Sequence, residues 1–204
     1  MKISILFVGA LNDGGFNQSA LQGAKRLRAT QDAALEIIGG IPYDPQAMSE
    51  ALSVAAAQSD GVVFVGGQGN LVTPPVAAQF PDKPFAIIQG NIQTANINSY
   101  DVLQEQSAFL AGVLAARMTK SGTVGHLSGH RVVPGLKGRA AFVSGVRHVD
   151  SDLPILTGFC GTQDDSDTTE IWTRALAEAG ADIVYTMLNA ARTGATQACR
   201  ETAI

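Results

Sequence analysis

Short runs of apolar residues alternate with amphipathic segments along the chain. Residues 3–9 form an apolar run that ends in glycine, as expected of a parallel strand buried on both faces. Residues 16–29 carry apolar side chains at helical spacing, and Asn12 or Asp13 can cap the start of that helix. The same alternation predicts strands at 35–38, 62–65 and 85–88 and a helix at 46–58. Because such alternation produces right-handed crossovers, residues 1–95 predict a small doubly wound domain with a parallel sheet.

The polar stretch 91–100 has neither helical nor strand periodicity, and it is predicted to link this domain to a second one that spans residues 96–204. The second segment opens with a strongly apolar helix at 104–118. Further strands are predicted at 123–127, 155–159 and 182–187, and further helices at 137–148, 168–179 and from Thr193. The pattern therefore predicts two Rossmann-like α/β lobes with parallel sheets and a ligand cleft at their interface.

Composition narrows the range of partners. The chain has 204 residues, of which 46% are hydrophobic and 16% charged, and its formal net charge is −4. Because lysine and arginine are not in excess, the composition does not indicate a nucleic acid or an anionic membrane surface as a partner. Cys160 and Cys199 have neither CxxC nor metal-ligand spacing and are interpreted as ordinary thiols. The first residues resemble a strand rather than a signal peptide, so an exported protein would have a leader that this sequence lacks.

The loop after the first predicted strand holds the most informative candidates, Asp13, Phe16 and Asn17. One interpretation makes Phe16 a hydrophobic staple and Asn17 a cap or an early helix residue. The other makes Phe16 a stacking ring and Asn17 a bidentate amide, which together would hold a flat heteroaromatic base. Both interpretations place the residues at the carboxyl end of the sheet, where parallel α/β folds bind ligands.

Two other loops follow predicted strands. Gly67 and Gln68 lie in a glycine-rich segment that fails the dinucleotide spacing, because Thr73 replaces the third glycine and Pro74-Pro75 are expected to interrupt the helix. We expect no cofactor there, although the loop can offer backbone groups to a ligand. Asn189 and Arg192 join a strand to a helix and either reach a polar ligand edge or form an ordinary connection.

Three further clusters are less favourable sites. His126 and Ser128 lack the glycine that a nucleophile elbow requires two residues before the serine, which weakens a hydrolase interpretation. His130 and Arg131 are expected in a solvated loop at the edge of the second sheet. The acidic cluster at 164–167 lacks the glycine and terminal glutamate of a calcium loop, so it is interpreted as a helix cap and no metal is expected.

Three segments in order resemble the basic membrane protein family of bacterial substrate-binding lipoproteins. They are DGGFNQSALQGAK at 13–25, SAFLAGVLAARMTKSGTVG at 107–125, and GAD at 180–182 followed by an apolar strand and Thr193-Gly194. The resemblance implies a type I periplasmic-binding-protein fold and capture of nucleosides for an ABC permease and ATPase. It also implies a periplasmic or membrane-anchored location, with Phe16 stacking on a base, Asn17 bonding its edge and Asp13 shaping the loop.

Departures from the family pattern affect the ligand and the second lobe. Gln89 stands where the family usually has an acidic residue, and Asn189 to Arg192 replace a glycine-rich loop. Family members continue beyond the position of Ile204, so the second lobe is expected to be truncated, and its open sheet edge predicts a homodimer. The sequence thus favours a receptor without catalytic activity; the alternatives are a cytoplasmic ligand-sensing regulatory module and an enzyme on a Rossmann-like scaffold.

Overall fold

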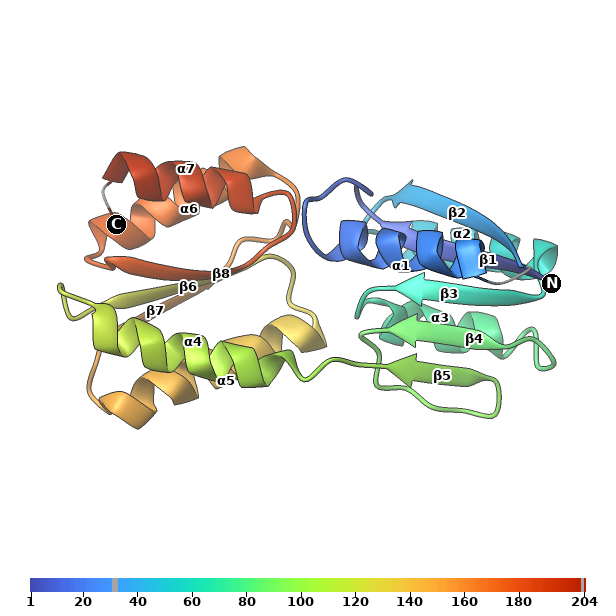
Figure 1. The fold of residues 1–204 in the computed structure, drawn as a ribbon, viewed down its shortest axis with the longest axis horizontal. Coiled ribbons are helices and arrows are strands. Elements are labelled where there is room, and N and C mark those ends of the chain that lie inside the picture. Colours follow the sequence, from blue (N-terminus) through green and yellow to red (C-terminus); the bar gives the residue numbers. More distant parts are fainter. Residues whose placement is uncertain (31–32, 203) are drawn as a thin grey trace. The chain divides into compact units, whose positions relative to one another are not determined.

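Two parallel β-sheets, each with helices on both faces, form the two compact units of the chain, Met1–Val102 and Leu103–Ile204 (Figure 1). The computed structural model describes residues 1–30, 33–202 and 204. The predicted α/β class with two Rossmann-like lobes is confirmed. Among the described residues, no helix is both long enough and apolar enough to cross a membrane.

The first unit contains a five-stranded sheet with the order β2-β1-β3-β4-β5. Its strands are β1 (Lys2–Val8), β2 (Ala34–Ile41), β3 (Gly61–Val65), β4 (Phe85–Ile88) and β5 (Ile97–Tyr100). Its helices are α1 (Phe16–Thr30), α2 (Pro45–Gln58) and α3 (Gly69–Ala77). Every neighbouring pair of strands is parallel, so the loops that follow the strands all emerge at one edge of the sheet.

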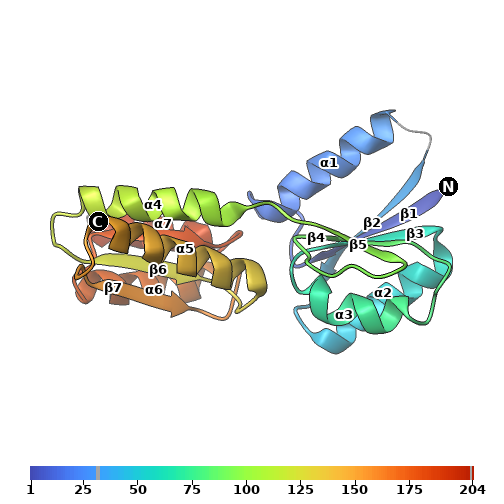
Figure 2. The ribbon, with the colours of Figure 1, turned by 90° about the horizontal axis from the view of Figure 1, so that it is seen from below.

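Alternating side chains of the central strands supply two separate cores. Leu6, Phe64 and Ile87 belong to the core that includes α2 and α3, whereas Ile5 and Phe7 belong to the core on the α1 side. Figure 2 shows α1 on one face of the sheet and α2 and α3 on the other. Burial on both faces explains why the strand sequences are nearly continuous apolar runs.

Two predictions for the first unit are wrong. Residues 97–100, which lie in the predicted linker, form β5 beside β4. The two compact units meet between Val102 and Leu103. Side-chain bonding compensates for the weak pattern: Asn96 Nδ2 donates to the carbonyls of Ala77, Phe80 and Lys83 at 3.0–3.2 Å.

The second error concerns Pro74 and Pro75, which do not interrupt the helix but lie inside α3. Their missing amides remove only two bonds from a helix of nine residues. Burial of Val72, Val76 and Ala77 against the sheet stabilises the helix instead, as expected where packing outweighs propensity.

The second unit contains a three-stranded sheet with the order β7-β6-β8. Its strands are β6 (Val124–Ser128), β7 (Ile155–Phe159) and β8 (Ile183–Met187). Its helices are α4 (Gln104–Met118), α5 (Val133–Val149), α6 (Ser166–Glu178) and α7 (Arg192–Thr202). Helices α4 and α5 cover one face and α6 and α7 the other (Figure 1), each with its own apolar cluster.

Glycines bring the backbones of α4 and α5 into direct contact. A Cβ added at Gly145 would lie 2.0 Å from the Phe109 carbonyl oxygen, and one added at Gly112 would lie 2.1 Å from that of Phe142. Backbone atoms cannot move aside as a flexible side chain can. The spacing of the two helices therefore requires glycine at both positions.

We expect Gly145→Ala to push α4 and α5 apart and to destabilise the second unit by about 2 kcal/mol or more, as overpacking does. Hydrogen exchange should show reduced protection of the α4 and α5 amides. Gly23→Ala in α1 is the matched control, because only the end of Arg26 lies near the added Cβ, at 3.9 Å. This control should stabilise its helix by up to about 1 kcal/mol. Unchanged α4 protection in Gly145→Ala would refute the close-contact argument.

Candidate functional site

The carboxyl edge of the first sheet holds the candidate residues of the first unit. Strand order reverses between β1 and β3, because the chain leaves β1 for β2 on one side and continues at β3 on the other. Such a switch point leaves a crevice at the carboxyl ends of the strands, which is where open α/β sheets bind ligands. The loop that follows β1 carries Asp13 and leads into α1, which begins with Phe16 and Asn17, and the loop that follows β3 carries Gly67 and Gln68.

Asp13 holds the first of these loops in shape. Its buried carboxylate accepts hydrogen bonds from the backbone amides of Gly15 and Gln18 through Oδ1 and of Asn17 through Oδ2, at 2.8–2.9 Å. These bonds satisfy amides at the start of α1 that have no partner within the helix. The loop-shaping role implied for Asp13 thus has a direct structural basis.

Asn17 is buried and ties α1 to the end of β1. Its Nδ2 donates to the carbonyls of Val8 and Ala10 at 2.8 and 3.0 Å, which uses both amide hydrogens. Only Oδ1 remains to accept a bond, so the bidentate amide pattern is not available in this arrangement. Phe16 is half-buried and packs beside the core on the α1 side.

Asn70, which the sequence did not single out, connects the loops that follow β3 and β4. Its Nδ2 donates to the Gly67 carbonyl at 2.9 Å, and its Oδ1 accepts from the Asn91 amide at 2.9 Å. Gln68 directly precedes α3 and is half-buried. The glycine-rich sequence of this loop is visible in the chain. The hydrogen bond between Asn70 and Asn91 is not, because it forms only when β3 and β4 lie next to each other in the sheet.

Gln89 has an unusual backbone conformation at the end of β4. Its φ is 63°, and among the described residues other than glycine it alone has a positive φ. Its backbone amide donates to the Tyr100 carbonyl at 2.7 Å, which anchors the turn to β5. A left-handed backbone at a residue that is not glycine costs about 1–2 kcal/mol and is concentrated at functional sites.

In the second unit, Gln163 organises the loop that holds Asn189. The Gln163 carbonyl accepts from the amides of Asn189 and Ala191 at 3.2 and 3.0 Å, and its Oε1 accepts from Asn189 N at 3.2 Å. Arg192 begins α7 and is exposed. No sequence motif indicated Gln163, because its partners lie 26 residues or more away along the chain.

His126 and Ser128 are adjacent but do not form a hydrolase site. His126 Nε2 and Ser128 Oγ form a hydrogen bond of 2.9 Å, yet both residues are buried. His126 Nδ1 has no partner in the part of the chain that the structure describes, so the group that should orient a catalytic histidine is missing. Burial and nearby Arg139 lower the pKa of His126 to about 4.

The acidic cluster caps α6, as predicted. Asp165 accepts hydrogen bonds from the amides of Asp167 and Thr168 and from Thr168 Oγ1. Within residues 1–30, 33–202 and 204, no group of three histidine, cysteine or acidic residues is placed to hold a metal. Cys160 and Cys199 are free thiols, and burial raises the pKa of both.

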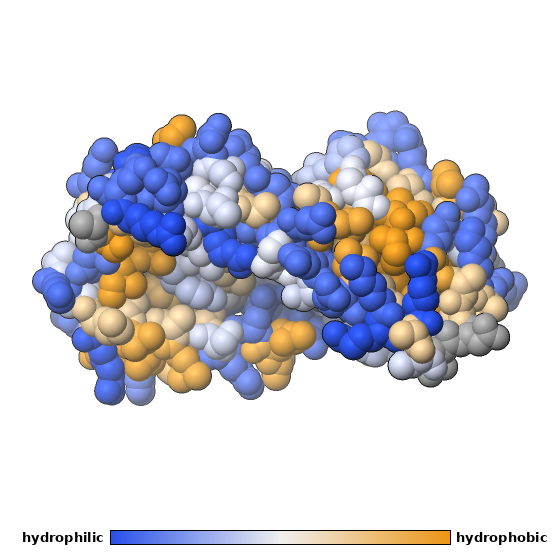
Figure 3. All heavy atoms as spheres, turned by 45° about the horizontal axis from the view of Figure 1, so that its top comes forward, coloured by the Kyte–Doolittle hydropathy of each residue, from blue (hydrophilic) through white to orange (hydrophobic). Residues whose placement is uncertain are grey.

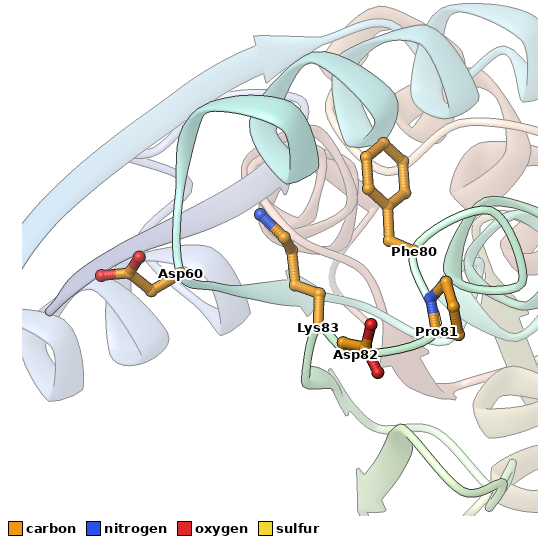
Figure 4. Close-up of a pocket in the computed structure, with 5 residues that line it drawn as sticks. All are labelled: Asp60, Phe80, Pro81, Asp82 and Lys83. Atoms are coloured by element: carbon orange, nitrogen blue, oxygen red, sulfur yellow. The ribbon is translucent and has the colours of Figure 1, made fainter.

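A pocket of about 340 Å³ lies at the opposite edge of the first sheet, where β3 and β4 begin (Figure 4). Asp60, Phe80, Pro81, Asp82 and Lys83 line it. Lys83 Nζ donates to the carbonyls of Ala56 and Ser59, and Asp60 Oδ2 accepts from the Lys2 amide at 2.7 Å. These charged groups stabilise the ends of α2 and β1, so the pocket is a poor candidate for the ligand site.

Comparisons with known proteins agree with this geometry. The family described as ABC transporter substrate-binding protein PnrA-like matches residues 1–204. Basic membrane protein A of Borreliella burgdorferi is 25% identical, over 98% of this chain and 60% of its own length. The ABC transporter nucleoside-binding protein BmpA of Lactococcus lactis is 26% identical, over 90% of this chain and 54% of its own length.

A solved structure supports the fold. A solute-binding protein of an ABC transporter system from Aeropyrum pernix superposes with a TM-score of 0.88 at 22% identity, over 100% of this chain and 59% of that one. The resemblance to the basic membrane protein family and to the type I periplasmic-binding-protein fold is therefore confirmed. The chain spans about 60% of the length of the first of these relatives.

Protonation of His126 should weaken the folded state in mild acid. The unfolded imidazole binds a proton below about its ordinary pKa of 6.5, whereas the folded one does so only near 4, so stability falls as the pH is lowered through this window. Between pH 7 and 5 the expected loss is about 2 kcal/mol. Urea unfolding of wild type and His126→Phe should show a smaller loss in the variant, whose phenyl ring fits among Phe142, Phe159 and Tyr185. His148→Phe, at an exposed site, is the control; equal losses in wild type and His126→Phe would contradict the assignment.

Proposed function

Because the chain belongs to the PnrA-like family of ABC transporter substrate-binding proteins, we propose that it captures a small solute for an ABC-type importer. In this proposal loop residues at the carboxyl ends of parallel strands contact the ligand, and an ABC permease and ATPase are the partners of the protein. The receptor binds its solute without chemical conversion. The observation that carries the proposal is the reversal of strand order between β1 and β3, the position at which parallel α/β sheets bind ligands, together with the strained backbone of Gln89 after β4.

A nucleoside or a similar purine-like molecule is the solute class we propose. The Lactococcus lactis relative is named as a nucleoside-binding protein. In this chain, Phe16 offers one face for stacking, Gln89 offers an amide with donors and an acceptor, and Asn17 offers its Oδ1. Gly67 and Gln68 add backbone groups from the neighbouring strand end, and Asn189 and Arg192 are the candidate ligand-contacting residues of the second unit.

Two alternatives are less well supported. An enzyme that uses a dinucleotide would need a glycine-rich loop that binds phosphate. The chain after β3 instead enters α3 through hydrogen bonds from each amide to the carbonyl three residues earlier, and Thr73 stands at the position of the third glycine. A regulatory module would bind the same ligand but signal through another protein. Two relatives carry the name lipoprotein, which favours a membrane-anchored extracytoplasmic location over that role.

We also propose that two copies associate through the second unit. Both β7 and β8 pair only with β6 in the described part of the chain, so each presents an open edge. On α4, Leu110, Leu114 and Met118 are exposed at four-residue spacing. Figure 3 shows apolar residues gathered in patches among hydrophilic ones on one face of the molecule.

Thermal unfolding against nucleosides, free bases and sugars tests the receptor proposal, because a ligand that binds only the folded state raises the midpoint. We expect a shift with at least one nucleoside. Phe16→Leu keeps an apolar side chain but removes the ring, so it should weaken binding several-fold, in line with about 0.5–1.5 kcal/mol for aromatic stacking. Phe80→Leu, at the opposite edge of the sheet, should bind as wild type does. A shift with sugars alone would reject the nucleoside, and no shift with any solute would reject the receptor.

Sedimentation velocity tests the association. We expect a dimer in the wild type and a monomer in Leu110→Lys/Leu114→Lys, because two lysines cannot be buried in an apolar contact without a large desolvation penalty. Leu71→Lys is the matched control, since that residue is 68% exposed but lies on α3 of the first unit. A wild-type monomer at high concentration would refute the proposal.

A further inference from the structure

Two arginines lie against one aromatic ring at the carboxyl edge of the second sheet. Phe159 is the last residue of β7, Arg131 lies in the loop that follows β6, and Arg139 is in α5. The guanidinium carbons of Arg131 and Arg139 are 5.5 and 6.0 Å from the centre of the Phe159 ring. A parallel sheet places the ends of β6 and β7 next to each other, so residues distant in sequence meet at this edge (Figure 1).

Neither guanidinium has a carboxylate partner in the part of the chain that the structure describes. A few other basic side chains do have one: Arg174 pairs with Glu170 and Glu201, and Lys2 pairs with Glu36. Lys137, on the same helix as Arg139, approaches Glu105 at 4.0 Å. Two unpaired guanidinium groups in a chain whose net charge is −4 concentrate positive charge locally.

The groups around the arginines do not cancel this charge. Burial, together with Arg139 itself, lowers the pKa of His126 to about 4, so the imidazole is neutral at pH 7 and Arg139 lies close enough to influence it. Asp164 lies near His130, where it opposes the lowering of the pKa of that histidine by burial. Helix α5, of 17 residues, begins at Val133, two residues after Arg131, and has no side-chain cap at Val132, so its first amides add partial positive charge.

We propose that Arg131 and Arg139 bind an oxyanion group of the captured ligand, so that this receptor prefers a phosphorylated or carboxylated solute to a neutral one. The inference rests on the proposed function for the solute class, but the arginine site itself is independent of Phe16. Guanidinium groups match the planar geometry of carboxylate and phosphate oxygens and bind them with two parallel hydrogen bonds. The Phe159 ring holds both side chains at the sheet edge, which reduces the side-chain conformational entropy that is lost when a ligand binds.

Calorimetric titration of matched neutral and anionic solutes tests the inference. The pairs are adenosine with adenosine monophosphate, and galactose with galacturonate, and inorganic phosphate is titrated alone. We expect the anionic member of at least one pair to bind at least tenfold more tightly to the wild type. Arg139→Gln and Arg131→Gln should remove that preference and leave binding of the neutral member unchanged.

Further variants separate charge from folding. Arg139→Lys keeps the charge but loses the paired donors, so it should retain more of the preference than Arg139→Gln. Arg117→Gln, at an exposed position on α4, should behave as wild type. If Arg139→Gln does not fold, Arg131→Gln and Arg139→Lys, each checked by thermal unfolding, supply the same comparison.

The outcomes distinguish this inference from the nucleoside proposal. Equal affinity for adenosine and its monophosphate would retain the nucleoside receptor and overturn the oxyanion site. Binding of galacturonate or inorganic phosphate that depends on Arg139, without binding of either adenine compound, would retain the oxyanion site and reject the nucleoside. Binding of anions that survives both glutamine variants, or binding of no solute at all, would overturn the oxyanion site.

Discussion

Strand direction is the constraint on which the other features depend. All strands within each sheet run parallel, so each must be followed by a segment that returns across a face of the sheet before the next strand begins. The returning helices bury both faces, which requires apolar strands. The loops after the strands are left at one edge as the place where polar side chains can face a ligand. The candidate residues of both units, from Phe16 to Arg139, lie in or beside such loops, because the loops that follow parallel strands all lie at the same edge of their sheet.

Many polar side chains at the carboxyl edges of the sheets form hydrogen bonds within the protein itself. Asp13 and Asn17 bind backbone groups of β1 and α1, Asn70 connects two loops, and Gln163 holds the loop of Asn189. Within each unit, fixed loops then hold the candidate groups in place: the strained Gln89 in the first unit and the two guanidinium groups beside Phe159 in the second. Groups held in this way favour binding by preorganisation, since few of them must be ordered when a ligand arrives.

Sequence reasoning was most successful where a pattern is local. The strand at 155–159 and the helix at 104–118 were predicted at their observed bounds, because apolar periodicity and a terminal glycine are visible within one segment. It failed where the decisive partner is distant. β5 has a polar sequence and exists because β4 and the Asn96 bonds support it, and α3 contains two prolines that packing overrides. For the proposed site, the loop after β1 can be singled out from its sequence, whereas Asn70, Gln163 and the approach of Arg139 to Phe159 cannot be, because they depend on which strands become neighbours.

At Gln89 the residue that would best stabilise the fold differs from the residue that we propose for ligand binding. Glycine would adopt the same left-handed conformation without the penalty of about 1–2 kcal/mol that a side chain incurs there. A variant selected only for thermal stability would therefore be drawn toward glycine at this position and would lose the side-chain amide that we propose for ligand binding. Stabilising the scaffold for use as a biosensor would accordingly mean leaving position 89 untouched and improving residues far from that edge.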